Sequence, residues 1–140
     1  MTTPLVRINL LVLIFAALLI LAALPLVASA FVPEDLARLK KEKNCPGCDL
    51  RSADLRGLNL FDANLEGANL MEANLENVNL EHATLDDAGL EKANLKGAII
   101  KNASMDHATI DDAVMNNTNF EGTVWIDGKI CKPGSIGACK

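Results

Sequence analysis

The stretch Ala63-Asn64-Leu65-Glu66-Gly67-Ala68-Asn69-Leu70 repeats one five-residue pattern, and this pattern decides the fold. A small residue and then Asn precede each leucine, and two polar or small residues follow it. Extending the pattern outward, every fifth residue from Leu50 to Trp125 is apolar, sixteen positions in all. Ten of them are leucines, Leu50 to Leu95, and the other six are Ile100, Met105, Ile110, Met115, Phe120 and Trp125. An uninterrupted period of this kind indicates an internal repeat.

A step of five residues excludes the two ordinary ways of burying an apolar face. Around an α-helix it rotates by about 140° and scatters the leucines over all sides. Along a flat strand it sends successive leucines to opposite faces. A chain that turns a corner once per repeat, always to the same hand, brings all sixteen side chains to one axis. The sequence therefore predicts an all-β solenoid.

The other repeat positions suit such corners. Two residues before each central residue the chain has Ala at eleven of the sixteen positions, and a small side chain fits beside a large inward one. One residue before the centre, Asn or Asp occurs nine times, and these side chains bond readily to nearby backbone in turns. The two residues after the centre are mostly charged, polar or Gly, so we expect them to face water.

This pattern closely resembles the pentapeptide repeat family over residues 48–124. The resemblance implies a right-handed quadrilateral β-helix with four repeats per coil, here about four coils. Gly or Asn at positions 57, 77, 97 and 117 agrees with a coil of twenty residues. That spacing predicts a turn with positive φ on one side of the square.

The first thirty residues have the layout of a secretory signal peptide. Arg7 precedes an apolar run from Leu10 to Leu24, and Pro25 and Ala28-Ser29-Ala30 follow. We expect cleavage after Ala30. The alternative is an uncleaved membrane anchor, because the run is almost long enough to span a bilayer. Contact with a membrane is expected only through such an uncleaved segment.

Cleavage after Ala30 would remove one basic residue, Arg7, and no acidic residue. The mature chain would then have 12 basic and 18 acidic residues and a net charge of −6. An acidic surface of this kind repels nucleic acid and anionic lipid. We therefore expect no nucleic acid partner.

Both ends of a solenoid need covering, because they expose core and unpaired backbone. Residues 33–43 predict a short capping helix, with Pro first, acids in the first turn and bases in the last. We therefore divide the chain into a signal peptide (1–30), a capping helix with linker (31–47), a β-helix (48–124) and a C-terminal cap (125–140).

All four cysteines lie in the exported part, where disulfides are stable. Cys131 and Cys139 predict a disulfide that closes the tail. Cys45 and Cys48 are expected to be structural, as core thiols or as a local disulfide, and the alternative is a thiol redox motif. A metal site formed by all four cysteines is excluded because the two pairs lie at opposite ends of the rod.

Stacking twenty residues per coil gathers acidic side chains on two neighbouring rows. These candidates are Glu66, Asp86, Asp87, Asp106, Glu91, Asp111 and Asp112. The flank either serves solubility, binds a basic protein or binds cations weakly.

The sequence contains no recognisable constellation for catalysis or for a cofactor, so we expect a non-enzymatic scaffold or protein-binding module. The signal layout, Cys-Pro-Gly-Cys before the repeats and a cysteine-bearing tail resemble exported pentapeptide repeat proteins of the cyanobacterial periplasm and thylakoid lumen. The alternatives are an acidic DNA mimic that inhibits a DNA-binding enzyme and a thiol oxidoreductase that uses Cys45 and Cys48.

Overall fold

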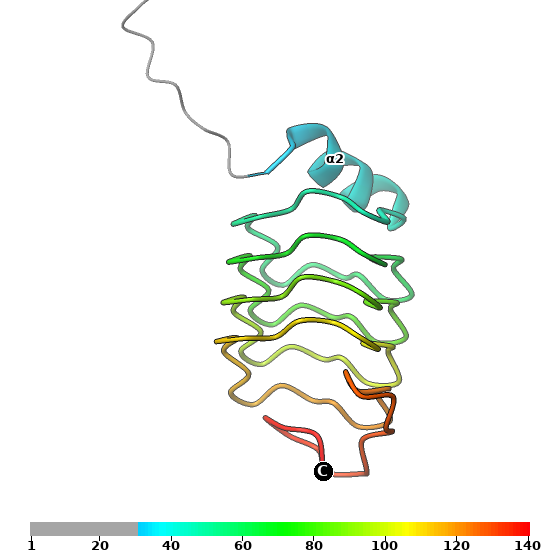
Figure 1. Ribbon diagram of the computed structural model, residues 1–140. Helices are drawn as coiled ribbons and strands as arrows, with labels where there is room; N and C mark the ends of the chain where they lie inside the picture. Colours follow the sequence, from blue (N-terminus) through cyan, green and yellow to red (C-terminus); the bar gives the residue numbers. More distant parts are fainter. Residues whose placement is uncertain (1–30) are drawn as a thin grey trace, which may run out of the picture.

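The computed structural model describes residues 31–140, and the signal peptide expected over residues 1–30 lies outside this range. The described chain is a stack of coils with a helix at one end and the C-terminal tail at the other (Figure 1). Helix α2, Pro33–Glu42, is the one α-helix of residues 31–140 and lies within the range that the sequence indicates. The coils of the described chain are joined by isolated β-bridges rather than by longer named strands.

Each coil contains twenty residues. The parallel bridges are formed by the residue that precedes a central residue. Each joins this residue to the one twenty positions later, as Asn64 to Thr84 and Thr84 to Ser104. Three kinds of backbone hydrogen bond connect the coils, and they start from the amide of the central residue, of the second residue after it and of the residue before it. The Leu70 amide donates to the Gly89 carbonyl at 2.7 Å, and the Gly89 amide donates to the Ala68 carbonyl at 3.0 Å. This register agrees with four repeats per coil.

The central residues of the repeats form the core. Thirteen of the sixteen, including Leu65, Leu70 and Leu75, are at most 2% exposed. The other three, Ile110, Met115 and Trp125, are partly buried and belong to the last coil. The small residues before the centres are also mostly buried, which explains why Ala dominates that position. The five-residue period therefore places its apolar side chains in one shared interior.

Every corner of the coil is a β-turn of the same kind. In the first, the Ala53 amide donates to the Leu50 carbonyl at 3.1 Å, and Ser52 has a φ of 55°. A positive φ recurs at this position in each corner from Ser52 to Gly122. The positive φ predicted at positions 57, 77, 97 and 117 is confirmed, and it occurs on the other three sides as well, which the spacing did not indicate. Because all four corners need the same turn, Asp, Glu, His and Lys also adopt the left-handed region where Gly and Asn are absent.

Asn and Asp side chains close these corners from outside. The Oδ1 atom of Asn64 accepts a hydrogen bond from the Glu66 amide at 3.1 Å, and that of Asn69 accepts one from the Met71 amide at 3.1 Å. The Nδ2 atom of Asn94 also donates to Oδ1 of Asn74 in the coil before it, at 3.3 Å. Where the residue before the centre is Asn or Asp, its side chain can thus satisfy a turn amide that faces water.

Helix α2 covers the first coil. It begins with Pro33 after Val32 and ends at Glu42, after which Lys43 has a φ of 53° and its amide bonds to the Leu39 carbonyl at 2.9 Å. The Leu39 side chain is fully buried in the core cluster. The helix thereby shields the apolar end of the stack from water.

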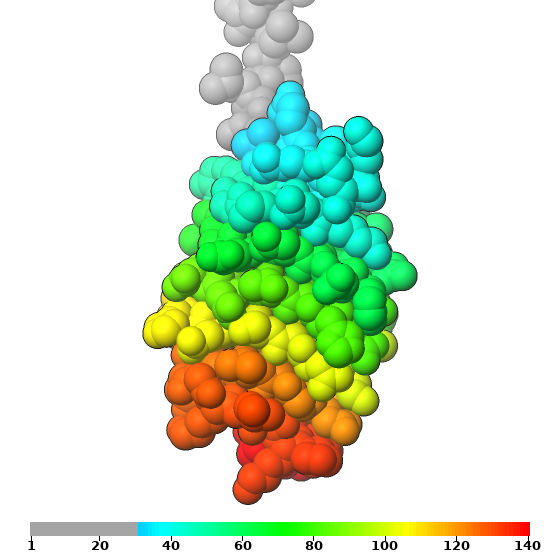
Figure 2. All heavy atoms as spheres, turned by 90° about the vertical axis from the view of Figure 1, so that its right-hand side faces the viewer, coloured from blue at the N-terminus to red at the C-terminus, as the bar shows by residue number. Residues whose placement is uncertain are grey.

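The tail covers part of the opposite end. Val124 pairs with Ile130, and Asn119 with Ile136, in antiparallel bridges. The tail therefore reverses direction instead of adding another coil. Figure 2 shows the resulting rod, with α2 and the tail at its two ends. Within residues 31–140, no helix has the length and apolar character that crossing a bilayer requires.

Candidate functional site

The seven acidic candidates lie on the two corners that border one side of the rod. Glu66, Asp86, Asp87 and Asp106 follow the central residues of one side, and Glu91, Asp111 and Asp112 follow those of the next. We name these seven residues the acidic flank. None of them is buried, since each is exposed or partly exposed. The twenty-residue register places Glu66, Asp86 and Asp106 in one row across three successive coils.

Two carboxylates of the acidic flank have partners in the protein. Oδ1 of Asp86 accepts the Ser104 hydroxyl at 2.5 Å and the Asp106 amide at 2.9 Å, so it links two coils. Oδ2 of Asp106 lies 3.3 Å from Nδ1 of His107. Among residues 31–140, the other five carboxylates form no ion pair and accept no hydrogen bond, and these are Glu66, Asp87, Glu91, Asp111 and Asp112. Their charges are available to a partner.

The side between these two corners carries little side-chain bulk at its middle. Gly89 occupies the outward position there, between Asn69 and Thr109 of the neighbouring coils. A Cβ atom at Gly89 would lie 3.1 Å from Oε2 of Glu91 and 3.9 Å from the Thr109 hydroxyl. The Glu91 carboxylate therefore lies over Gly89, in the space that a side chain at this position would fill.

Two acidic residues outside the flank, Asp49 and Asp54, are neutralised by arginines of the same turn. Arg56 makes two hydrogen bonds to Asp54, from Nε to Oδ1 at 2.8 Å and from Nη2 to Oδ2 at 2.7 Å. These bonds lower the pKa of Asp54 to about 2. Arg51 bonds to Asp49 in the same way and also lowers the pKa of that carboxyl. The corners at Arg51 and Arg56 therefore contribute little free negative charge.

Cys45 and Cys48 form a local disulfide beneath helix α2, with 5.4 Å between their Cα atoms. Both cysteines are buried, at 0% and 1% exposed. Two residues of the helix enclose the pair. The Arg38 Nη2 atom lies 2.6 Å from Sγ of Cys48, and Oδ1 of Asp35 lies 3.1 Å from the same Nη2 atom. Oδ2 of Asp35 also accepts the Asp49 amide at 2.9 Å.

Possible ligand atoms of Asp35, Cys45 and Cys48 all lie within 4.8 Å of one another. A metal needs thiolates there, and the disulfide removes them. The Arg38 charge also opposes a cation at this place. Because the sulfurs are buried and the disulfide ties the linker to the first coil, the arrangement suits a structural role.

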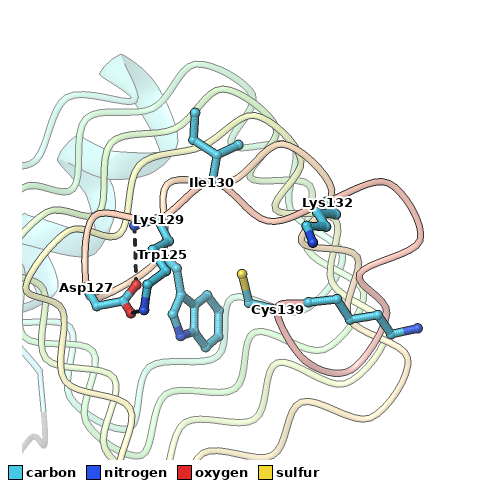
Figure 3. Close-up of a pocket in the computed structure, with 7 residues that line it drawn as sticks. Trp125, Asp127, Lys129, Ile130, Lys132 and Cys139 are labelled. Atoms are coloured by element: carbon cyan, nitrogen blue, oxygen red, sulfur yellow. Dashed lines mark hydrogen bonds and ion pairs between the residues drawn. The ribbon is translucent and has the colours of Figure 1, made fainter.

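The C-terminal pair, Cys131 and Cys139, is also a disulfide, with Cα atoms 4.9 Å apart. Beside it the tail encloses a hollow of about 380 Å³. Figure 3 shows Trp125 and Cys139 facing this hollow, with Lys132 at its edge and Asp127 bonded to Lys129. The Trp125 ring packs edge-on against Phe120, with centroids 4.9 Å apart. The hollow therefore borders the end of the core.

The sequence predicted the disulfide between Cys131 and Cys139 and left Cys45 and Cys48 either as core thiols or as a local disulfide. The groups around Cys48 were missed. Asp35 was considered only as an acid of the first helical turn and Arg38 was not considered, although both lie near Cys48. Their i, i+3 spacing, which places them on one helix face, was the available signal.

The comparisons with known proteins agree with this geometry. Residues 48–87 and 88–124, more than half of the chain, match the family described as pentapeptide repeats (8 copies). A search of curated proteins gives no significant match.

Solved structures of similar proteins include a pentapeptide repeat protein from the Arabidopsis thaliana thylakoid lumen, 26% identical with a TM-score of 0.53 over 55% of this chain and 54% of that one. Rfr23 from the cyanobacterium Cyanothece 51142 is 28% identical, with a TM-score of 0.53 over 64% of this chain and 82% of its own. HetL from Nostoc sp. Strain PCC 7120, involved in heterocyst differentiation regulation, is 28% identical, with a TM-score of 0.50 over 62% of this chain and 51% of its own.

The present chain thus spans about half of the length of the Arabidopsis protein and of HetL. These relatives imply a right-handed quadrilateral β-helix, in agreement with the twenty-residue coils. Because the family match covers more than half of the chain, the chain belongs to the pentapeptide repeat family.

Proposed function

We propose that this protein is an exported, non-enzymatic scaffold that binds a basic protein through the acidic flank. The observation that carries the proposal is the set of five carboxylates without a partner on two neighbouring corners of a rigid rod. Opposite charge on a binding surface raises the rate of encounter and selects the partner. The Glu91 carboxylate over Gly89 extends the negative charge between the two corners.

The rod is well suited to this role because its shape does not depend on a ligand. Hydrogen bonds between coils and a continuous core fix the distance from one acidic residue to the next. A partner therefore meets a preorganised surface, which lowers the entropy that binding costs.

Export to a periplasm or a thylakoid lumen is part of the proposal. The apolar segment from Leu10 to Leu24 and two disulfides support it, since disulfides persist in oxidising compartments. The thylakoid lumen origin of the Arabidopsis relative gives further support.

The test is a pull-down from an extract of the exporting compartment with the full chain as bait. A variant that carries Asp87→Asn, Glu91→Gln and Asp111→Asn is compared with a control that carries Asp62→Asn, Glu76→Gln and Glu81→Gln. Both variants remove three negative charges, but the control leaves the acidic flank intact.

We expect the flank variant to lose a basic protein that the control retains, and raising the salt concentration to release it. Equal recovery by both variants would contradict the proposal and leave the flank a role in solubility alone.

A further inference from the structure

The last coil has an open edge along residues 108–117. In the inner coils, the amide of each central residue donates to the next coil, as Leu90 donates to the Thr109 carbonyl at 2.8 Å. The tail supplies the corresponding acceptors for the second half of the last coil, where Phe120 donates to the Ser135 carbonyl at 2.9 Å. It supplies none for the first half, although Gly137 of the tail lies beside Asn117 at the far end of this edge. Within residues 31–140, no acceptor bonds to the amides of Ile110, Asp112, Met115 and Asn117.

The same edge also leaves two carbonyl groups without a hydrogen bond and part of the core exposed. The carbonyls of Ala108 and Ala113 accept no hydrogen bond from the described residues, whereas those of Ala88 and Ala93 accept the amides of Thr109 and Val114, both from the next coil. The side chains of Ile110 and Met115 are partly exposed, although Leu90 and Leu95, which precede them in the stack, are fully buried. An edge of this kind is a template for another strand.

We propose that the open edge binds an extended, basic segment of a partner protein, which adds to the stack as half of a further coil. Such a segment accepts hydrogen bonds from the four free amides and donates to the two free carbonyls. An apolar side chain of the segment covers Ile110 or Met115, as the next central residue of a repeat would.

The charges at the corner of the open edge select the occupant. Asp111 and Asp112 are both exposed and unpaired there, between the two open sides. A second copy of this chain, docked edge to edge, would bring four carboxylates together at that corner, and like charges at such a contact are costly. A segment with Lys or Arg near its centre places the opposite charge there.

The inference goes beyond the proposed function because it rests on backbone groups at the end of the rod. It shares Asp111 and Asp112 with the acidic flank, so the tests use variants that separate the two surfaces. Asp86 and Asp106 belong to the flank alone, whereas Ile110 and Met115 belong to the open edge alone.

The probe is a fluorescent synthetic peptide, Ala-Asn-Leu-Lys-Lys-Ala-Asn-Leu-Lys-Lys, which imitates two repeats. Fluorescence anisotropy measures its binding to the full chain. We expect a peptide with Glu in place of each Lys to bind at least about tenfold more weakly. We expect the same loss when the two Asn amide nitrogens are methylated, because they can no longer donate to Ala108 and Ala113.

Variants of the protein test the charges and the apolar surface of the open edge. Asp111→Asn with Asp112→Asn weakens binding of the peptide, and the matched pair Asp86→Asn with Asp106→Asn leaves it unchanged. Met115→Lys places a charge on the open edge and also weakens binding, with circular dichroism as the check that the coil is intact. Equal effects of the two Asp pairs would overturn the inference even if the pull-down supports the acidic flank.

Amide hydrogen exchange by NMR gives the residue-level result. With saturating peptide, the amides of Ile110, Asp112, Met115 and Asn117 are expected to become protected, whereas those of Asp54 and Asn59 at the other end do not change. Peptide binding that leaves the four amides unprotected would overturn the inference. So would protection that depends on protein concentration without peptide, because a second copy would then occupy the edge.

Discussion

The guanidinium group of Arg38 lies 2.6 Å from Sγ of Cys48, although the two residues come from the capping helix and the first coil. A positive charge at this distance favours a thiolate over a thiol. We therefore predict that Arg38→Met makes the Cys45–Cys48 disulfide harder to reduce, by about threefold to tenfold in the equilibrium constant. Titration with dithiothreitol and mass spectrometry of the alkylated thiols measure this constant. Arg38→Lys keeps the charge, and an equally large effect in that variant would contradict the electrostatic explanation.

Two corner glycines with similar φ values test how much an added side chain destabilises a corner. Gly67 and Gly97 have φ values of 62° and 68°. A Cβ atom at Gly67 meets no atom within 4 Å, but at Gly97 it lies 2.4 Å from Oδ1 of Asn77. Gly67→Ala is expected to cost about 1–2 kcal/mol in the free energy of unfolding, through the left-handed backbone alone. Gly97→Ala should cost more, as measured by urea denaturation.

A double mutant isolates the added cost at Gly97. In a chain that carries Asn77→Gly, the clash is removed while positive φ at position 77 remains easy. Gly97→Ala should then cost the same as Gly67→Ala. A cost that persists in the double mutant would show that the neighbouring amide is not its source.

Asp54 gives the stability of the first coil a predictable pH dependence. Its hydrogen bonds with Arg56 lower the pKa to about 2, below the ordinary value of 3.8. Because the folded pKa is the lower one, the contribution is present above about pH 4 and is lost as the pH falls through about 2. NMR titration of the Asp54 carboxyl carbon measures the pKa directly. With Arg56→Gln we expect the pKa to return toward 3.8, and an unchanged value would exclude Arg56 as the cause.

Much of the fold follows from the five-residue period, because Leu65, Leu70 and Leu75 share an interior only if the backbone turns after each. The positive φ in every corner could not be read from Gly and Asn alone, because stacking forces residues such as Glu72 and Lys92 into the same turn. Nor could the path of residues 126–140 be predicted, since the tail has no period and its pairing with Val124 depends on tertiary contacts.

The end of the core was only partly readable. Ile and Met replace Leu from position 100 onward, but this change does not distinguish the buried Ile100 and Met105 from the partly exposed Ile110 and Met115. Which amides stay free depends on where the tail turns back, and the sequence does not encode that locally. The role of two interior threonines also could not be predicted from the local sequence. Thr118 and Thr123 replace Ala in the interior because their hydroxyls donate to the carbonyls of Leu95 and Ile100, at 2.7 and 2.6 Å.

Truncating central residues on one side of the rod should show that burial decreases toward the last coil. Leu95 is fully buried, whereas Met115, the next central residue on that side, is partly exposed. Leu95→Ala should lower the free energy of unfolding by about 2–5 kcal/mol, and Met115→Ala by about 1 kcal/mol. Thermal denaturation followed by circular dichroism compares the two. Equal losses would contradict an open end at Met115.

The tail disulfide should stabilise the end of the rod locally. Cys131→Ser with Cys139→Ser opens a short loop and is expected to cost about 2–3 kcal/mol. Trp125, the single tryptophan, packs on Phe120 beside this disulfide, so its fluorescence should shift to the red as the tail loosens. Exchange of the Phe120 amide should accelerate, while exchange of the Leu70 amide serves as the control in the middle of the stack.

The account as a whole depends on coils of twenty residues, and NMR scalar coupling across hydrogen bonds tests this most directly. The structure places the Leu70 amide 2.7 Å from the Gly89 carbonyl and the Leu75 amide 2.8 Å from the Asn94 carbonyl. We predict couplings from these two amide nitrogens to the carbonyl carbons of Gly89 and Asn94. Couplings to carbonyls at any other sequence separation would contradict the register and, with it, both proposed surfaces.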